Sequence, residues 1–213
     1  MIDTVQPIRN KFIAVEGVIG VGKTTLAKQL AQRLKAKLIL EVVEENPFLM
    51  EFYDDIKGKA FQTQIFFLLS RYRQMTELLQ IDLFNTNIVS DYMFMKDRIF
   101  AQLTLNDAEL NMYSTIFDIL KERLIQPNLI IYLFADLDKV LANIRNRNRP
   151  FEKNIQPEYL YNLTLAYDKF FSTSHEYHVI KIDTTDIELT KLSLSKQFDM
   201  LIDEIEKLSN AYE

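Results

Sequence analysis

Glycine is scarce in this chain of 213 residues, and the place where it gathers constrains the fold more than any other feature. Only four glycines occur, and three of them lie between Gly17 and Gly22. An apolar run at residues 12–15 precedes this stretch, Lys23 and Thr24 close it, and leucines at helical spacing follow. A strand, a glycine-rich loop ending in lysine and threonine, and a helix in this order predict a phosphate-binding loop (P-loop).

The glycines of this loop allow consecutive backbone N–H groups to turn toward phosphate oxygens at the positive end of a helix dipole. Lys23 is expected to reach the outer phosphates of a nucleoside triphosphate, and Thr24 is expected to ligate Mg²⁺. An incidental lysine in a structural turn is the alternative, but the concentration of scarce glycines argues against it. We therefore predict that ATP, or another nucleoside triphosphate, binds Gly17, Gly20, Val21, Gly22, Lys23, Thr24 and Thr25.

Four further apolar runs follow the first one, at residues 38–43, 87–90, 129–134 and 178–182. Stretches with apolar residues at helical spacing lie between them, at residues 24–35, 60–80, 108–125, 137–147, 157–171 and 189–208. Strands that alternate with helices predict an α/β fold with a five-stranded parallel sheet flanked by helices. Ligands of such sheets bind beyond the carboxyl ends of the strands, so Glu41, Asp91 and Asp136 become candidate site residues.

The composition excludes several classes of protein. A net charge of −5 argues against a protein that grips polymeric nucleic acid through a basic face. The absence of cysteine rules out disulfides, thiolate metal sites and a cysteine nucleophile. The polar segment at residues 1–11 does not resemble a signal peptide, and no apolar run reaches membrane-spanning length, so we expect a cytoplasmic protein without a membrane partner.

Four blocks of the sequence resemble the deoxynucleoside kinase family, in particular its bacterial deoxyadenosine and deoxyguanosine kinases, and together they extend over essentially the whole chain. They are the P-loop, EVVEENPFLMEFY at residues 41–53, AFQTQIFFLLSRYRQ at residues 60–74, and the arginine-rich stretch at residues 144–160. The resemblance implies a single domain at residues 1–213 that phosphorylates the 5′-hydroxyl of a deoxynucleoside in nucleotide salvage, with ATP and Mg²⁺. It also implies a homodimer and, from the block at residues 44–49, a purine substrate.

The second block contains the predicted general base. A sugar hydroxyl is a poor nucleophile at neutral pH, so phosphoryl transfer needs a carboxylate that accepts its proton. We predict that Glu41 has this role and also contacts the substrate. The alternative is that Glu41, Glu44 and Glu45 form a solvated acidic turn or a helix cap. The resemblance also assigns Tyr53 to the 3′-hydroxyl of the sugar, although Tyr53 could instead be a core aromatic residue.

The third block supplies the predicted nucleobase contacts, Gln64 and Arg71. These residues are seven positions apart, so both project from one face of a helix, and a glutamine amide can donate to and accept from a base edge. Phe66 and Phe67 are expected in the core. Asp97, in a following segment that also resembles the family, is a weak candidate for a further base contact.

The region after the third strand departs from the family pattern. The family has an acidic residue followed by arginine and serine, whereas this chain has Asp91, Tyr92 and Met93. Asp91 can still serve as a Mg²⁺ ligand, because hard cations prefer carboxylate oxygen. The cationic contact that the arginine makes near the 5′-hydroxyl is left open, to be filled by Tyr92 or by another residue.

The fourth block resembles the arginine-rich lid of the family, at about residues 145–157. Guanidinium groups bind phosphate oxygens through paired hydrogen bonds and stabilise charge on a transferring phosphoryl group. The resemblance assigns Arg147 and Arg149 to catalysis, Arg145 to ATP binding and Glu152 to the sugar. A solvated basic helix end is the alternative interpretation of these arginines.

Two other functions remain under consideration. A nucleoside monophosphate kinase of the thymidylate kinase type shares the P-loop, the sheet and the lid, but its acceptor phosphate would be repelled by Glu41, Glu44 and Glu45. A catalytically silent structural relative is the second alternative. The presence of Lys23 and Asp91 argues against it.

Overall fold

The computed structural model describes residues 12–78, 87–173, 176–192 and 195–210. The strands are β1 (Phe12–Gly17), β2 (Lys37–Ile39), β3 (Ile88–Ser90), β4 (Leu129–Phe134) and β5 (His178–Asp183). The helices are α1 (Lys23–Arg33), α2 (Leu49–Phe52), α3 (Ile56–Leu78), α4 (Lys96–Thr104), α5 (Asp107–Lys121), α6 (Leu137–Arg147), the 3₁₀ helix η1 (Pro150–Glu152), α7 (Pro157–Thr173), α8 (Leu189–Leu192) and α9 (Lys196–Asn210).

The five strands form one parallel sheet in the order β2-β3-β1-β4-β5, which confirms the predicted fold class. In the middle of the sheet, Ala14 of β1 pairs with Ser90 of β3 on one side and with Ile130 of β4 on the other. The side chains of β1 are buried throughout, as expected for a parallel strand covered by helices on both faces. The apolar run at residues 12–15 therefore corresponds to a strand whose side chains are buried on both faces of the sheet.

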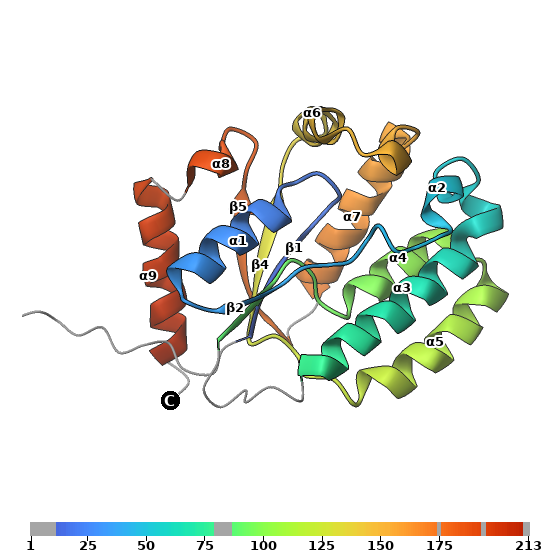
Figure 1. The fold of residues 1–213 in the computed structure, drawn as a ribbon, viewed down its shortest axis with the longest axis horizontal. Coiled ribbons are helices and arrows are strands. Elements are labelled where there is room, and N and C mark those ends of the chain that lie inside the picture. The colour runs from blue at the N-terminus through green and yellow to red at the C-terminus, as the bar shows by residue number, and fades with distance from the viewer. Residues whose placement is uncertain (1–11, 79–86, 174–175, 193–194, 211–213) are drawn as a thin grey trace, which may run out of the picture.

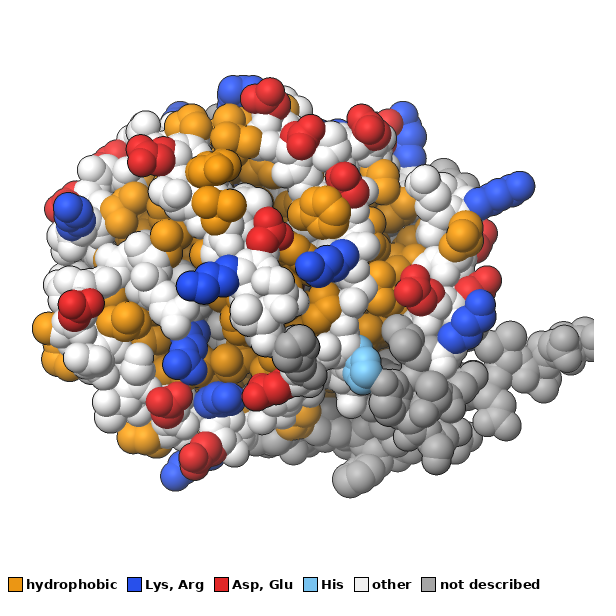
Figure 2. All heavy atoms as spheres, turned by 180° about the vertical axis from the view of Figure 1, so that it is seen from behind, with side chains coloured by type: hydrophobic (Ala, Val, Ile, Leu, Met, Phe, Trp, Pro, Cys, Tyr) orange, Lys and Arg blue, Asp and Glu red, His pale blue; other side chains and the backbone are white. Residues whose placement is uncertain are grey.

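Helices cover both faces of the sheet (Figure 1), with α3, α4, α5 and α7 gathered on one side and α1, α8 and α9 on the other. The loops that leave the carboxyl ends of the strands lie at one edge, close to α2, α6 and α8. On the face shown in Figure 2, acidic and basic side chains are interspersed. Among the described residues, none of the helices has both the length and the apolar character needed to cross a membrane.

Strand β2 ends earlier than the predicted strand at residues 38–43. Beyond Ile39 the chain leaves the sheet, and side chains replace the hydrogen bonds that a neighbouring strand would supply. Gln74 donates to the carbonyl oxygen of Leu40 at 2.8 Å, and the backbone N–H of Glu41 donates to Asp91 at 2.7 Å. The apolar run of the sequence did not reveal this change of partners, which moves Glu41 off the sheet and into a cavity.

The helix predicted at residues 189–208 is two helices, α8 and α9. Ser195 separates them, because its hydroxyl donates to the carbonyl of Leu192 at 2.7 Å and accepts from the N–H of Phe198 at 3.3 Å. That arrangement is typical of a helix N-cap. Helix α3 begins at Ile56, four residues before the predicted start, and residues 79–80 of the predicted helix lie outside the described ranges.

Candidate active site

The P-loop depends on glycine at positions where a side chain has no room. Gly17 ends β1 with a φ of 144°, and a Cβ there would lie 2.3 Å from the carbonyl oxygen of Leu133. Gly22 precedes α1 with a φ of 108°, and a Cβ there would lie 2.2 Å from a methyl carbon of Leu189. Glycine alone adopts such positive φ values readily. The loop backbone is thereby shaped to expose its N–H groups at the start of α1.

Lys23 is folded over the carbonyl groups of its own loop. Its ammonium donates to the carbonyl oxygens of Gly17 and Val18, at 2.9 and 3.0 Å. Burial and the nearby ammonium of Lys96 lower the pKa of Lys23 to about 8. A polyanionic ligand in the loop would stabilise the charged form of Lys23, so this lysine is poised to bind phosphate.

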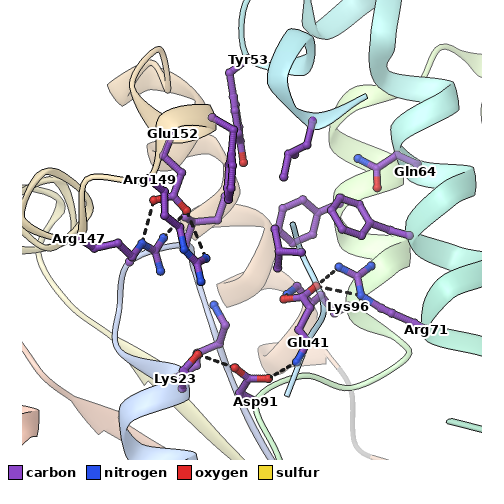
Figure 3. A pocket seen from close by; sticks show the side chains of 18 residues that line it. Lys23, Glu41, Tyr53, Gln64, Arg71, Asp91, Lys96, Arg147, Arg149 and Glu152 are labelled. Carbon is purple, nitrogen blue, oxygen red and sulfur yellow. Dashed lines mark hydrogen bonds and ion pairs between the residues drawn. The ribbon is translucent and has the colours of Figure 1, made fainter. Parts of the chain in front are cut away.

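Asp91, directly after β3, connects the P-loop to the segment after β2. One carboxylate oxygen accepts from the hydroxyl of Thr24 at 2.5 Å, and the other accepts from the backbone N–H of Glu41 at 2.7 Å (Figure 3). Asp91 is buried. A single side chain therefore sets the distance between the phosphate-binding loop and the predicted base.

The carboxylate of Glu41 is held by two cations from two different helices. Arg71 of α3 donates to Oε1 through Nε at 3.0 Å and also through a terminal nitrogen. Lys96 of α4 donates to Oε2 at 2.6 Å. Burial alone would raise the pKa of Glu41, but the ion pairs with Arg71 and Lys96 outweigh burial and hold that pKa well below its usual range. Glu41 is thus an ionised, oriented carboxylate at the wall of the cavity.

A second buried carboxylate, Glu16, lies under the loop at the end of β1. Its oxygens accept from the backbone N–H of Met93 at 2.7 Å and from the hydroxyl of Tyr167 at 3.1 Å. Burial raises the pKa of Glu16, although Lys96 and Lys23 oppose the shift. Glu16 therefore ties β1 to the segment after β3 and to α7.

One cavity contains most of the predicted acceptor residues. Gln64, Arg71 and Phe67 of α3 line it together with Glu41 and Tyr53. Figure 3 shows Gln64 and Arg71 on the same helix, facing the side of the cavity that holds Glu41. A second cavity begins at the P-loop and is lined by Gly20, Val21, Gly22, Lys23, Thr24, Thr25, Asn143, Arg147, Arg149 and residues 187–190. Lys23, Thr24, Arg147 and Arg149 line both cavities, so the two are continuous at the point where phosphate would lie.

Comparisons with known proteins agree with this geometry. The family model for deoxynucleoside kinases matches residues 13–210. A deoxyguanosine kinase of Bacillus subtilis (strain 168) is 39% identical over 202 residues, which cover 93% of this chain and 94% of that protein. A deoxyadenosine kinase of Dictyostelium discoideum is 36% identical over 84% of this chain and 74% of its own length. The chain belongs to the deoxynucleoside kinase family.

A solved structure of deoxyadenosine kinase from M. mycoides with bound dATP shares the fold of this deoxynucleoside kinase. The two chains superpose with a TM-score of 0.78 at 23% sequence identity, over 91% of this chain and 98% of the other. The resemblance of the four sequence blocks to this family is therefore confirmed, and the chain is a kinase.

The end of the cavity where nucleobase contacts were predicted is polar. Gln64 is buried, and its amide nitrogen donates to the hydroxyl of Thr104 at 3.3 Å. The same hydroxyl donates to the carbonyl of Phe100 at 2.8 Å, so it can only accept from Gln64. This arrangement leaves the carbonyl oxygen of Gln64 for other partners. Arg71 lies 4.6 Å above the ring of Phe67 and pairs with the buried Asp97, which does not line the cavity and so acts through Arg71.

Phe67 is buried, as expected, but it also lines the cavity, whereas Phe66 is only half-buried.

Tyr53 and Glu152 lie together at the predicted sugar end. Burial raises the pKa of Tyr53 well above its usual range, so the hydroxyl remains a hydrogen-bond donor. Tyr53 therefore faces the cavity while its ring packs edge-on against Tyr159.

The arginines of the predicted lid are engaged by carboxylates. Arg147 donates to both oxygens of the buried Glu152, at 2.8 and 2.5 Å. Arg149 lies 3.0 Å from Glu44, which belongs to the segment after β2. Both arginines reach the cavity (Figure 3). Arg145 lies on another face of α6 and lines neither of the P-loop cavities. It lines a hollow with Asn148, Lys153 and Pro157, and this hollow shares Arg149 and Glu152 with the acceptor cavity.

Two residues that follow β3, Tyr92 and Lys96, bear on the departure from the family pattern. Tyr92 is fully buried, and its hydroxyl donates to Gln74 at 2.5 Å, so its polar group is engaged by α3 rather than by Glu41. Lys96, which the sequence argument did not single out, makes the cationic contact with Glu41. Its position five residues after Asp91, beyond the carboxyl end of a strand, is the signal that could have identified it.

Proposed function

We propose that this deoxynucleoside kinase transfers the γ-phosphoryl group of ATP, or of another nucleoside triphosphate, to the 5′-hydroxyl of deoxyadenosine or deoxyguanosine. One observation carries the proposal. The carboxylate of Asp91 contacts both Thr24 in the P-loop and the backbone of Glu41 in the acceptor cavity. This contact supports a reaction in which a phosphate donor and a hydroxyl acceptor meet between these two residues.

In the proposed reaction, Glu41 accepts the proton of the 5′-hydroxyl. The 5′ oxygen forms a bond to the γ-phosphorus while the bond from that phosphorus to the bridging oxygen breaks, and ADP leaves. The loop N–H groups and Lys23 hold the donor phosphates. Arg147 and Arg149 exchange their carboxylate partners for phosphate oxygens as residues 145–157 close over the site and exclude water. Tyr53 and Glu152 bind the 3′-hydroxyl.

Mg²⁺ is part of this proposal, and the residues present fit it. Thr24 and Asp91 bring a hydroxyl and a carboxylate oxygen within 2.5 Å of each other beside the loop. Among the described residues, no cluster of three or more His, Cys, Asp and Glu side chains is available to hold a metal. A site with few protein ligands suits Mg²⁺, which keeps several waters and binds mainly to substrate phosphates. When bound there, it would neutralise charge on the donor phosphates.

The preference for purines rests on the relatives and on the base end of the cavity. The two relatives named above are a deoxyguanosine and a deoxyadenosine kinase. Gln64 and Arg71 offer an acceptor and donors to a base edge. Competition among the four deoxynucleosides and their ribose forms tests the assignment. A higher kcat/KM for deoxycytidine or thymidine would contradict it.

The rival assignment, a thymidylate-kinase-like enzyme, requires cations for the phosphate of its acceptor. Arg71 and Lys96, at the acceptor end, are both paired with Glu41. An added phosphate would have to compete with this buried carboxylate, which favours a neutral acceptor. Assays that offer dTMP beside the four deoxynucleosides decide between the two, since phosphorylation of dTMP alone would support the rival.

We also propose a homodimer, with α3 and α5 at the interface, and a cytoplasmic location. These helices lie side by side (Figure 1), and α5 exposes 53% of Met112 and 57% of Ile119, while α3 exposes 49% of Leu69. Such an apolar stripe is suited to a second copy of the same face. Sedimentation of the wild type and of Met112→Lys/Ile119→Lys tests the dimer, and cell fractionation tests the location.

A further inference from the structure

Lys96 is placed to hold the carboxylate of Glu41. Its side chain is only 5% exposed and lines the acceptor cavity, although it is the first residue of α4. Its ammonium binds Oε2 of Glu41 and lies 5.6 Å above the ring of Phe100. Arg71 binds the other oxygen, Oε1. Each carboxylate oxygen of Glu41 therefore has its own cation (Figure 3).

The two cations differ in what else they contact. Arg71 also pairs with Asp97 and stacks on Phe67 at the base end of the cavity, so a bound nucleobase competes for its N–H groups. Glu41 is the ion-pair partner that the structure gives for Lys96. A ligand that turns Arg71 toward the base thus leaves Lys96 in place on the carboxylate.

We propose that Lys96 is the positioning residue for Glu41, whose carboxylate it keeps aimed at the 5′-hydroxyl when the nucleobase engages Arg71. This inference rests on the proposed function. It also assigns to α4 the cationic contact that the sequence left open after Asp91, where the chain has the buried Tyr92.

The charged neighbours of Glu41 all belong to the same buried network. They come from β1, α1, α3, the end of β3 and α4, and they are Glu16, Lys23, Arg71, Asp91 and Lys96. Tyr53, Tyr92 and Tyr167 also face it, and burial raises the pKa of each. Among these groups, Arg71 and Lys96 are the two that form ion pairs with the carboxylate of Glu41.

The variants Lys96→Met and Lys96→Arg distinguish the effect of the positive charge of Lys96 from the effect of its shape. Lys96→Met should lower kcat by about 10²-fold, the loss typical of one electrostatic contact in an active site. Lys96→Arg keeps the charge and should recover most of that activity. Lys28→Met, the same change on the exposed face of α1, is the matched control and should behave as the wild type. Thermal unfolding of each variant shows whether it is folded.

A double-variant cycle tests whether Lys96 acts through Glu41. Adding Lys96→Met to Glu41→Gln should cost little further activity, because both changes remove the same effect. Losses that multiply in the double variant would overturn the inference. The turnover of the wild type with deoxynucleosides tests the proposed function separately.

Discussion

The two ends of the active site are built by different means. The proposed donor end is one continuous segment, the P-loop, with its backbone N–H groups and two adjacent side chains, Lys23 and Thr24. The acceptor end is assembled from side chains that start far apart in the sequence, since Glu41, Arg71 and Lys96 come from three different elements. Local sequence is sufficient to form the first, whereas the second depends on the packing of α3 and α4 against the sheet.

This difference has an energetic consequence. In the proposed reaction, the donor end binds the phosphate charge, which is the same in every nucleoside triphosphate. Its selectivity among nucleoside triphosphates can therefore be low. The acceptor end must discriminate between similar bases and sugars, which requires buried polar groups that are costly to leave without partners. Substitutions at the donor end should therefore affect every substrate equally, and those at the acceptor end should affect substrates unequally.

The largest effect is expected for Lys23→Ala at the donor end, which should abolish phosphoryl transfer to all substrates. The hydrogen bonds of the lysine are to the carbonyl groups of its own loop, so the melting temperature should stay close to that of the wild type. Lys28→Ala, on the same helix but exposed, is the control. If Lys23→Ala retains a tenth of the turnover, the P-loop is not the catalytic phosphate site.

Glu41→Gln should lower kcat by about 10²- to 10⁴-fold, the range of a general base, with little change in nucleoside affinity. Glu44→Gln is the matched control from the same segment. Its ion pair with Arg149 is mostly exposed and should contribute little. Steady-state kinetics of both variants with one nucleoside suffice. Equal losses at the two positions would place the base elsewhere, with Asp91 the first residue to test.

Gln64→Ala should change the ranking of substrates rather than abolish activity. A buried group that loses its partner penalises the substrate that uses it, so kcat/KM of the best nucleoside should fall more than that of the worst. Measurement with all four deoxynucleosides gives the comparison directly. A uniform loss would mean that Gln64 supports α3 or the pocket instead of binding the base.

The smallest effect is expected for Thr104→Val, which should reduce the preference between bases by only a few-fold, the value of one neutral hydrogen bond. Without the hydroxyl, the amide of Gln64 is free to turn over and present its nitrogen to the base. Thr104→Ser keeps the hydroxyl and should keep the preference. Equal preferences in Thr104→Val and the wild type would show that Thr104 does not orient Gln64.

The positions of the predicted donor residues could be inferred from the sequence more completely than those of the predicted acceptor residues. The P-loop could be located because its glycines, Lys23 and Thr24 are consecutive, and the fold class followed from the alternation of apolar runs. The early end of β2 could not be predicted, because it depends on hydrogen bonds from Gln74 and Asp91, which are distant in the sequence. The same limit applies to Arg145, whose face on α6 follows from packing.

Lys96 shows the limit most clearly. A comparison of residue types at matched positions found Tyr92 where the family has arginine and left the contact open. The cation that contacts Glu41 is Lys96 of α4, and only the folded arrangement brings it to that carboxylate. Conversely, the common face of Gln64 and Arg71 could be predicted, because their spacing of two helical turns on α3 is a local property.

The contacts of Asp91 give this kinase a common reference point for two groups that belong to different segments of the chain. One side chain, 4% exposed, contacts both the P-loop helix and the backbone of the predicted base. A displacement of β3 would therefore shift both groups in the same direction and leave their separation nearly constant. The alignment needed for in-line transfer is in this way insulated from small motions of the sheet.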